Sequence, residues 1–497
     1  MASKDGIQRV EDAEANSKIS DGEKGHSDST SSLSSGHKEY ILARHGTLEL
    51  EPMPDMDDAD PLNWSSWKKV INLLLVVFHA MMATFTAAAI QSSFALIAED
   101  LDVPIQSASY LTSEVIVVLG VAPLLWRPIS HRYGRRPILL VSLLLSIVGN
   151  IGCAKSPTYA AMAACRAITA FFICPASAIG SGVVTEMFFR QERARWMGVW
   201  TVMVTLGIPL APFIFGFVVL RVDYRWVYWI LAITNGVQLL LYFFLGDETR
   251  YIRNGEVRGG KAGPKSLLRF SRIDPTPLSL RDFTRPLELA LRPSVVIPAA
   301  AYAMIFLWQV MISIEIPQVF AIQFHLNTQQ VGLQYLALII GSLIGEVIGG
   351  TLSDRWMLLK QRRTGSVPRP EYRLWLSYFG FALGICGTVV FLVQLGNAGE
   401  TWNITPLIGA AIQAAGNQIV TTVLITYAVD RNQSDSASVG VFITLVRQVW
   451  GFIGPFWFTD MILNTGYGAS AGIATAMMVG VSVVPTVLLQ WRGAGQK

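Results

Sequence analysis

The chain has 497 residues, of which 52% are hydrophobic and only 15% are charged. Soluble proteins carry about 25% charged residues, so this chain has too few charges to cover the surface of a water-soluble protein of its length. The formal net charge of +4 is too small to indicate nucleic-acid binding, and no Cys/His zinc pattern occurs. The composition therefore indicates an integral membrane protein.

The first 69 residues are rich in Ser, Asp, Glu and Lys. A segment with so little apolar surface cannot offset the entropy lost on ordering, so we expect residues 1–69 to be a disordered cytoplasmic tail. No apolar core follows a basic start near the N-terminus, so no cleaved signal peptide is expected. The first spanning helix must then direct the chain to the membrane.

Twelve stretches are apolar enough to cross a bilayer, which takes about 20 residues in a helix. They are 70–92, 107–126, 137–154, 159–184, 196–219, 226–246, 294–315, 331–351, 373–395, 403–428, 438–461 and 471–491. The runs are continuous rather than alternating, which excludes membrane strands. We expect an all-α membrane protein with two six-helix halves, 70–246 and 294–491, a cytoplasmic linker, 247–293, and a short cytoplasmic tail, 492–497.

Lys and Arg residues lie almost entirely on one side of these crossings. If the N-terminal segment is cytoplasmic, the connectors of the opposite side hold only Lys155, Arg221 and Arg225. The positive-inside rule then places both termini in the cytoplasm. We expect a multi-pass protein of the cell membrane, with the vacuolar membrane as the alternative.

The sequence offers no machinery for using nucleotide energy. It contains no G-x-x-x-x-G-K-[ST] segment and no long soluble stretch that could form a catalytic domain. An enzyme is therefore not expected, and neither a cofactor nor a metal site is implied. We expect a monomer in contact with membrane lipid that moves a small-molecule substrate, driven by an ion gradient or by the substrate's own gradient.

Two predicted helices are rich in glycine or proline. Gly341, Gly345 and Gly349 are spaced by four in helix 331–351, which favours close packing of a neighbouring helix. Helix 196–219 contains Gly207, Pro209, Pro212 and Gly216, which must bend or loosen it. A packing kink and a moving element of a transport cycle explain the second pattern equally well.

A cationic loop follows the second helix of each half. The loops read Arg132-Tyr133-Gly134-Arg135-Arg136-Pro137 and Gly350-Thr351-Leu352-Ser353-Asp354-Arg355. Such an internal repeat is typical of secondary transporters built from two related halves.

At these residues the chain resembles the major facilitator superfamily, and most closely its fungal twelve-helix drug/proton antiporter branch, over roughly residues 60–491. The segments Asp60–Trp64 and Glu248–Tyr251 are similar to motifs that flank helices 1 and 6 in that branch. The resemblance implies two halves that rock around a central cavity and export small amphipathic compounds, such as drugs or secondary metabolites, in exchange for protons. It implies a role in the conformational switch for Arg132, Gly134, Arg135, Arg136, Gly207, Pro212, Gly216, Asp354 and Arg355.

The chain departs from the family pattern at several positions. His131 stands where the family has an Asp that latches one conformational state, so the latch must differ here or rest on Asp354. Ala211 and Phe215 replace two glycines of the antiporter motif, which weakens the argument for export over uptake.

Ionisable and polar side chains at membrane depth are costly, so they are candidates for function. We expect Glu114 to carry the proton, with His79 as the second candidate. The expected substrate cavity contains Arg447, Gln448, Gln413, Asn417, Glu315 and Arg166. The alternative is that such groups pair with one another and only fix helix packing.

Two other functions fit the same sequence. The carboxylates Glu114 and Glu315 could serve the uptake or exchange of a cationic nutrient such as a polyamine. A membrane receptor of the same fold that does not transport its ligand is the alternative from another class.

Overall fold

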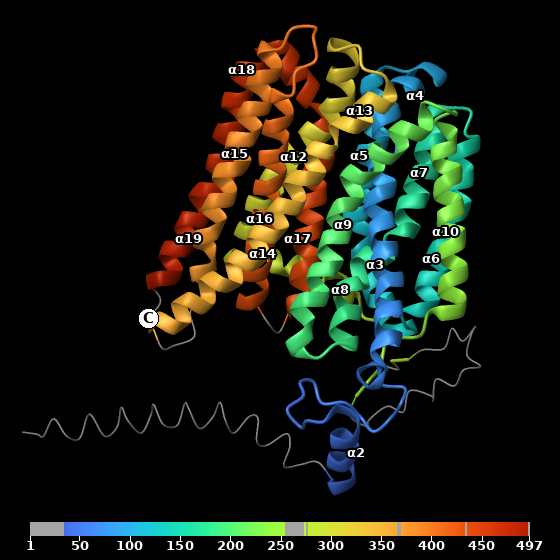
Figure 1. Ribbon diagram of the computed structural model, residues 1–497, viewed down its shortest axis with the longest axis vertical. Helices are drawn as coiled ribbons and strands as arrows, with labels where there is room; N and C mark the ends of the chain where they lie inside the picture. Colours follow the sequence, from blue (N-terminus) through green and yellow to red (C-terminus); the bar gives the residue numbers. More distant parts are fainter. Residues whose placement is uncertain (1–33, 254–272, 275–276, 365–368, 433–434, 496–497) are drawn as a thin grey trace, which may run out of the picture.

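The computed structural model describes residues 34–253, 273–274, 277–364, 369–432 and 435–495. These residues form an upright bundle of helices (Figure 1), with twelve candidate membrane spans and no strand among them. The all-α fold with twelve crossings that the sequence predicted is confirmed.

The first six crossings form the N-terminal half. They are α3 (Ser66–Ala88), continued by η2 (Gln91–Ser93) and α4 (Phe94–Asp100); α5 (Ile105–Tyr133); α6 (Arg136–Lys155); α7 (Tyr159–Ile173) with α8 (Pro175–Met187); α9 (Arg190–Val219); and α10 (Arg225–Leu245). The fourth crossing is divided at Pro175, whose missing N–H is tolerated in the first turn of α8.

The last six crossings form the C-terminal half. They are α12 (Pro293–Gln323); α13 (Thr328–Gln334) with α14 (Leu336–Thr364); η4 (Pro370–Arg373) with α15 (Leu374–Asn397); α16 (Thr405–Arg431); α17 (Ser436–Ile453) with η6 (Gly454–Phe456); and α18 (Phe458–Met478), the π-helical turn η7 (Val479–Val483) and α19 (Val484–Gly495).

The chain is irregular at two points near the end of the eleventh predicted crossing. Gly466, with φ +79°, is a non-helical residue inside α18, and it lies in the gap that the sequence predicted between residues 461 and 471. The 3-10 turn Gly454–Phe456 falls inside the predicted crossing 438–461, where Pro455 marks it.

Both ends of the described chain lie on one side of the bundle, as an even number of crossings requires. Helix α2 (Ser35–His45) and the end of α19 occupy the lower side in Figure 1. We call this the termini side and the opposite side the far side. Lys155, Arg221 and Arg225 lie in the connectors of the far side.

The expected disorder of the N-terminal tail is wrong for residues 34–69, and residues 1–33 lie outside the described part. Ile41 of α2 is buried. The segment that follows α2, residues 46–65, which we call the N-terminal strap, is held on the N-terminal half by polar contacts. The fully buried Asp60 accepts two hydrogen bonds from Arg253, at 2.8 and 3.0 Å. Paired charges thus order a segment whose composition alone predicts disorder.

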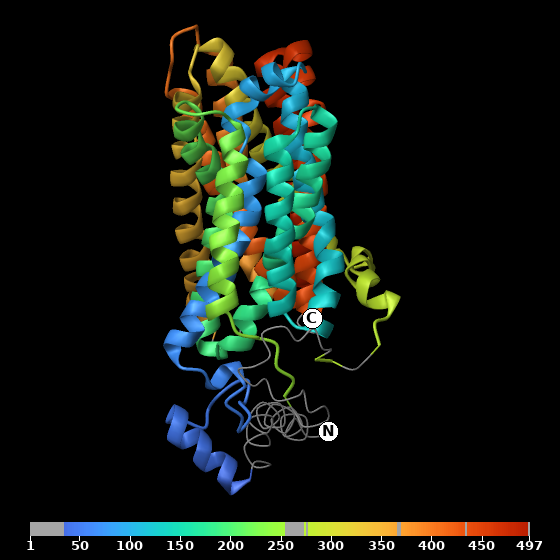
Figure 2. The ribbon, with the colours of Figure 1, turned by 90° about the vertical axis from the view of Figure 1, so that its right-hand side faces the viewer.

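The linker contains a short helix, α11 (Leu280–Glu288), which lies beside the bundle on the termini side (Figure 2). Asp274 and Asp282 pair with Arg132 at the end of α5, at 3.0 and 3.2 Å. Arg285 and Arg292 both pair with Asp435 just before α17. The linker therefore ties the two halves together.

The hydrogen bond from Arg285 holds the pKa of the Asp435 carboxyl below its usual range. A carboxylate with a lowered pKa contributes stability above its ordinary pKa, and that contribution is lost as the pH falls. This contact between the linker and α17 is therefore retained at neutral pH.

Glycines bring α14 and α15 into backbone contact with α16. A Cβ atom on Gly341 or Gly345 would collide with Ala411 or Ala415 of α16. The interpretation of the glycine stripe as a packing face is thus confirmed. Gly416 of α16 faces α15 in the same way, where an added Cβ would lie 2.7 Å from the carbonyl oxygen of Gly380.

We predict that Gly416→Ala destabilises the protein, because its methyl group must displace the α15 backbone, at a cost of about 1–3 kcal/mol. The matched control is Gly472→Ala in α18, where no atom lies within 4 Å of the added Cβ. Thermal unfolding of the purified full chain should show a lower Tm for Gly416→Ala alone. Equal Tm values for both variants would contradict the close contact of α15 and α16.

Candidate substrate cavity

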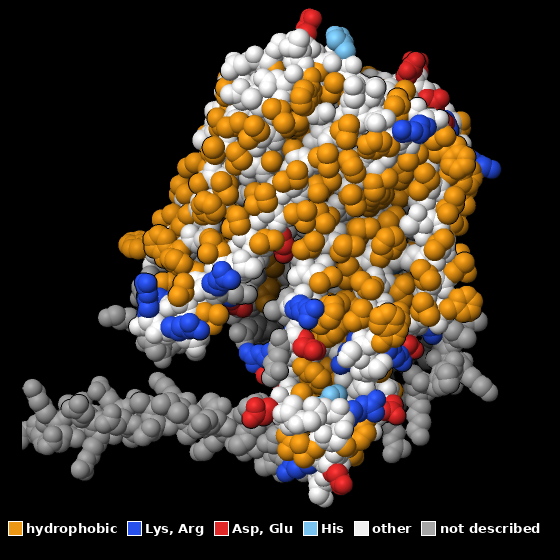
Figure 3. Space-filling model, viewed as in Figure 1, with side chains coloured by type: hydrophobic (Ala, Val, Ile, Leu, Met, Phe, Trp, Pro, Cys, Tyr) orange, Lys and Arg blue, Asp and Glu red, His pale blue; other side chains and the backbone are white. Residues whose placement is uncertain are grey.

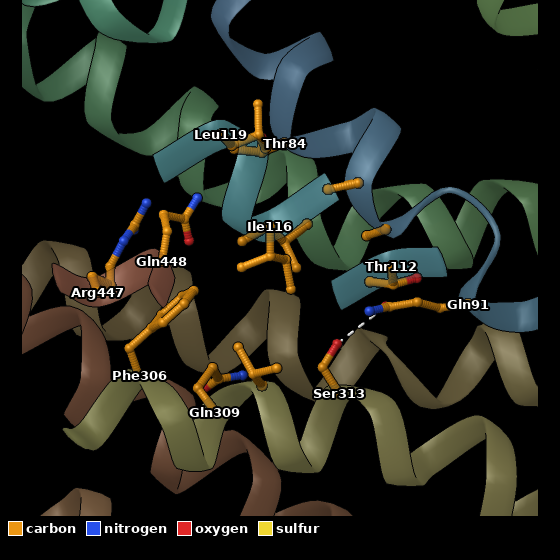
Figure 4. A pocket seen from close by; sticks show the side chains of 14 residues that line it. Thr84, Gln91, Thr112, Ile116, Leu119, Phe306, Gln309, Ser313, Arg447 and Gln448 are labelled. Carbon is orange, nitrogen blue, oxygen red and sulfur yellow. Dashed lines mark hydrogen bonds between the residues drawn. The ribbon is translucent and has the colours of Figure 1, made fainter. Parts of the chain in front are cut away.

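Two adjoining cavities lie between the halves, each with about 510 Å³ of space free of protein atoms. The first, drawn in Figure 4, is lined by α3, η2, α5, α9, α12 and α17. The second is lined by α3, α9, α12, α14, α16 and α17. They share Thr84, Ile208, Phe306, Gln309 and Arg447. Both halves thus contribute to one central space.

Arg447 of α17 is the only charged side chain among the described residues that line either cavity. Its Nη1 donates to the Tyr302 hydroxyl at 3.0 Å, and its guanidinium carbon lies 4.6 Å from the centre of the Phe306 ring. Tyr302 and Phe306 come from α12, so two aromatic rings hold the cation in place.

Several polar atoms in the cavity walls are buried and have no hydrogen-bond partner among the described residues. They are Thr112 Oγ1, Gln309 Oε1, Asn417 Oδ1, Gln448 Oε1 and Arg447 Nε. Buried polar atoms normally find a partner, in the protein or in a bound molecule. The remaining walls are apolar, which is typical of sites for small organic molecules.

On the far side the halves touch backbone to backbone. Gly216 of α9 faces Gly332 of α13, where an added Cβ on Gly216 would lie 2.9 Å from the Thr328 carbonyl oxygen. An added Cβ on Gly332 would lie 2.7 Å from the Pro212 carbonyl oxygen. This contact leaves no room for side chains, so it closes the far side between α9 and α13.

A polar cluster joins the halves at the opposite edge of the far side. Gln106 of α5 donates to the Pro455 carbonyl oxygen at 2.6 Å. The Thr459 hydroxyl of α18 lies 3.0 Å from Gln106 Oε1 and 3.0 Å from Glu315 Oε1. Glu315 is only 2% exposed, so its carboxyl group is part of the closed far side rather than of the cavity wall.

On the termini side the surface is hollowed between the halves (Figure 3). At the second cavity, Gln418 of α16 donates to Thr205 of α9 at 3.1 Å and to Glu346 of α14 at 2.7 Å. Closer to the termini, Arg127 donates to Ser438 at 3.1 Å. Polar side chains therefore connect the halves here, in contrast to the glycine contact of the far side.

The prolines of α9 lie beside the cavities. Proline cannot donate to the carbonyl group four residues before it, so Pro209 and Pro212 remove the helical partners of Thr205 and Ile208. Both of these residues line the second cavity. Gly207 packs on α3, where an added Cβ would lie 2.7 Å from the Met81 carbonyl oxygen.

The structure brings together half of the cavity residues expected from the sequence. Arg447 and Gln448 line the first cavity, and Arg447 and Asn417 line the second. Gln413 is fully buried and donates to the Ile305 carbonyl oxygen inside the C-terminal half. Arg166 is buried in the N-terminal half, where it donates to the carbonyl oxygens of Leu111 and Ala87.

Neither proton-carrier candidate lines either of these two cavities. Glu114 lies two residues after the cavity-lining Thr112, which is about 200° around α5, and it interacts electrostatically with Arg166. His79 is fully buried within the N-terminal half, where its Nε2 lies 3.3 Å from the Ser142 hydroxyl.

The first cationic loop is held by carboxylates of its own half. Gly134 has φ +90° and faces Glu248, whose carboxylate accepts the backbone N–H groups of Arg135 and Arg136 at 3.0 Å each. The Arg135 side chain pairs with Glu186 at 2.7 Å and is nearly buried. Glycine is required here by both its conformation and the adjacent carboxylate.

The loop also contacts the linker. Arg132 pairs with Asp274 and Asp282 of the linker. Arg355 is exposed on α14, and the side chain of Asp354 lies outside the described residues, so its expected role in the latch is not described here.

Five polar residues of the first cavity were not expected from the sequence: Thr84, Gln91, Thr112, Gln309 and Ser313. The Ser313 hydroxyl donates to Gln91 Oε1 at 3.1 Å across the two halves (Figure 4). Gln309 and Ser313 are four residues apart in an otherwise apolar helix, a pattern that places both on one face and could have identified them.

Comparison with known proteins agrees with this architecture. The model of the Major Facilitator Superfamily matches residues 73–455, so the chain belongs to this family of transporters. Its sequence is similar to the efflux pump vrtL of Penicillium aethiopicum, with 27% identity over 89% of this chain and 92% of the relative. It is also similar to the efflux pump radE of Floropilus chiversii, with 28% identity over 88% of this chain and 82% of the relative.

The fold is similar to that of a solved peptide transporter POT in complex with alafosfalin. The two structures share a TM-score of 0.62 and 14% sequence identity, over 87% of this chain and 97% of the other. At this identity the likeness concerns the fold alone.

We predict that Gly216→Leu separates the halves on the far side, because no space exists for a side chain between α9 and α13. Spin labels at Leu220→Cys and Leu333→Cys, both at exposed positions, report this separation by double electron–electron resonance. The mean distance should increase in Gly216→Leu and stay unchanged in Gly198→Leu, where no atom lies within 4 Å of the added Cβ. An unchanged distance in both variants would show that the glycine contact does not close this side.

Proposed function

We propose that this member of the Major Facilitator Superfamily is a proton-coupled exporter of small amphipathic compounds that works by alternating access. The observation that carries the proposal is the cavity between the halves, which has apolar walls and a few unpartnered polar atoms. A site at the interface of two halves is exposed to one side or the other when the halves rock.

The proposed direction rests on sequence. Because Lys and Arg gather in connectors of the termini side, we assign that side to the cytoplasm. The hollow between the halves then faces the cytoplasm, from which an exporter must load its substrate. Export is also the function named for the relatives from Penicillium aethiopicum and Floropilus chiversii.

We propose Glu315 as the group that couples protons to this cycle. The Thr459 hydroxyl has one hydrogen but lies near two acceptors, Glu315 Oε1 and Gln106 Oε1. When Glu315 is ionised, Thr459 can satisfy only one of them. When Glu315 is protonated, it donates to Thr459, and Thr459 donates to Gln106.

Protonation of Glu315 therefore completes the hydrogen bonds that close the far side. A proton taken up from the far side would return the empty transporter to the state that loads from the cytoplasm, as antiport requires. Glu114, in charge balance with Arg166, and the buried His79 remain alternative proton sites within the N-terminal half.

We predict that Glu315→Gln abolishes transport driven by a pH gradient, because the amide mimics the protonated acid and keeps the far side closed. Transport is measured as accumulation of three tritiated compounds of one size, 2-naphthoate, 2-naphthamide and 2-naphthylmethylammonium, in proteoliposomes with an acidic interior. Protein-free liposomes supply the passive background. At least one compound should accumulate above that background with the unmodified protein.

Glu114→Gln should retain most of this accumulation, and Glu400→Gln, which alters an exposed carboxylate in a connector, serves as the control. Normal accumulation by Glu315→Gln together with loss of accumulation by Glu114→Gln would show that Glu114, and not Glu315, couples protons to transport. No accumulation of any compound by the unmodified protein would contradict the proposed export of such compounds.

A further inference from the structure

The strongest unexplained feature of the cavity is an uncompensated positive charge. Arg447 makes no ion pair with a described carboxylate, and its guanidinium remains charged at any physiological pH. A charge at membrane depth is costly unless a partner balances it. Tyr302 and Phe306 are neutral, so they orient the cation without cancelling its charge.

Three other ionisable groups at similar depth line neither cavity and have hydrogen-bond partners of their own. Glu315 accepts from Thr459 at 3.0 Å, and Glu346 accepts from Gln418 at 2.7 Å. Arg166 is directed to two carbonyl oxygens inside the N-terminal half. Arg447 differs from these groups because it lines both cavities, where a molecule can reach it.

The geometry around Arg447 leaves donors for a bound molecule. A guanidinium has five N–H donors, one of which is used by Tyr302, and the buried Nε has no partner among the described residues. A carboxylate or sulfonate can accept two of the free N–H groups side by side.

Most of the wall of the first cavity is apolar. It includes Ala87, Ala88, Ile116, Leu119, Ile208 and Val310, whereas Gln91, Thr112 and Ser313 lie at the end away from Arg447 (Figure 4). Apolar walls bind a hydrocarbon or aromatic body by excluding water. The cavity therefore combines one cationic end with apolar walls beside it.

We propose that Arg447 makes this cavity a site for amphipathic organic anions, with the acidic group of the substrate on its guanidinium and the apolar body against α5 and α12. This inference rests on the proposed function and specifies its substrate class. It counts against a cationic nutrient such as a polyamine, because the only charge on the described cavity walls would repel it.

The test uses the purified full chain and equilibrium binding of the three tritiated naphthalene compounds. These have one size and shape but are anionic, neutral and cationic. Since hydrogen bonds to charged groups are stronger than neutral ones, 2-naphthoate should bind about ten-fold more tightly than 2-naphthamide, and 2-naphthylmethylammonium most weakly.

Arg447→Gln should abolish the preference for the anion while the affinity for 2-naphthamide stays within about two-fold, which also shows that the variant is folded. Arg447→Lys should keep part of the preference, because it retains the charge but loses the paired donors. Arg362→Gln removes the same charge from the exposed end of α14 and should leave all three affinities unchanged.

The inference is overturned if the unmodified protein binds none of the compounds, binds anion and amide equally, or prefers the cation. It is also overturned if Arg447→Gln keeps the preference. Accumulation in proteoliposomes distinguishes a failure of the anion site from a failure of the proposed transport function. If all three compounds are transported equally, transport stands without the anion site. If the anion binds but no compound crosses, the site stands without transport.

Discussion

The structure depends on one constraint: a charge at membrane depth is costly unless a partner stabilises it. Inside each half the chain meets this constraint with its own atoms. Arg166 donates to backbone carbonyl oxygens. Glu315 accepts a hydrogen bond from Thr459, and Glu346 accepts one from Gln418. Arg447 is the exception, and it lies where the two halves meet. The site and the division into halves are therefore parts of one arrangement.

The two sides of the bundle are closed by different kinds of contact. On the far side, glycines allow α9 and α13 to meet without side chains, and a small polar cluster joins the halves at the opposite edge. On the termini side, single hydrogen bonds and the ion pairs of the linker connect the halves. When the halves move apart, water can replace these polar contacts, because it can solvate the separated groups. The linker can then keep the halves associated while the cavity opens.

The sequence was sufficient for the parts of the fold that the bilayer dictates. The length of an apolar helix is set by the membrane, so twelve crossings could be counted, and the gap predicted before the last one contains the non-helical Gly466. That the N-terminal strap is ordered could not be predicted from composition, because its order depends on a buried ion pair between Asp60 and Arg253, almost two hundred residues apart.

The site shows the same limit at the level of single residues. Arg447 and Asn417 could be named from the sequence because polar residues are rare in apolar helices. Gln413 satisfied the same criterion but faces the interior of its own half. The rotation of a helix about its axis is set by packing between helices, and composition does not reveal it. Helix geometry puts Thr112 and Glu114 on opposite faces of α5, and packing turns the face with Thr112 toward the cavity.

The most direct test of alternating access is the labelling of a cysteine in the cavity from each side of the membrane. Ser313→Cys places a thiol in the first cavity, in a chain whose four native cysteines have been replaced. A membrane-impermeant maleimide is applied to sealed vesicles of either orientation. The account predicts that this thiol is labelled from both sides, and that an imposed pH gradient shifts the balance between them. Labelling from one side only, under every gradient, would contradict the account and indicate a fixed binding pocket, as in a receptor.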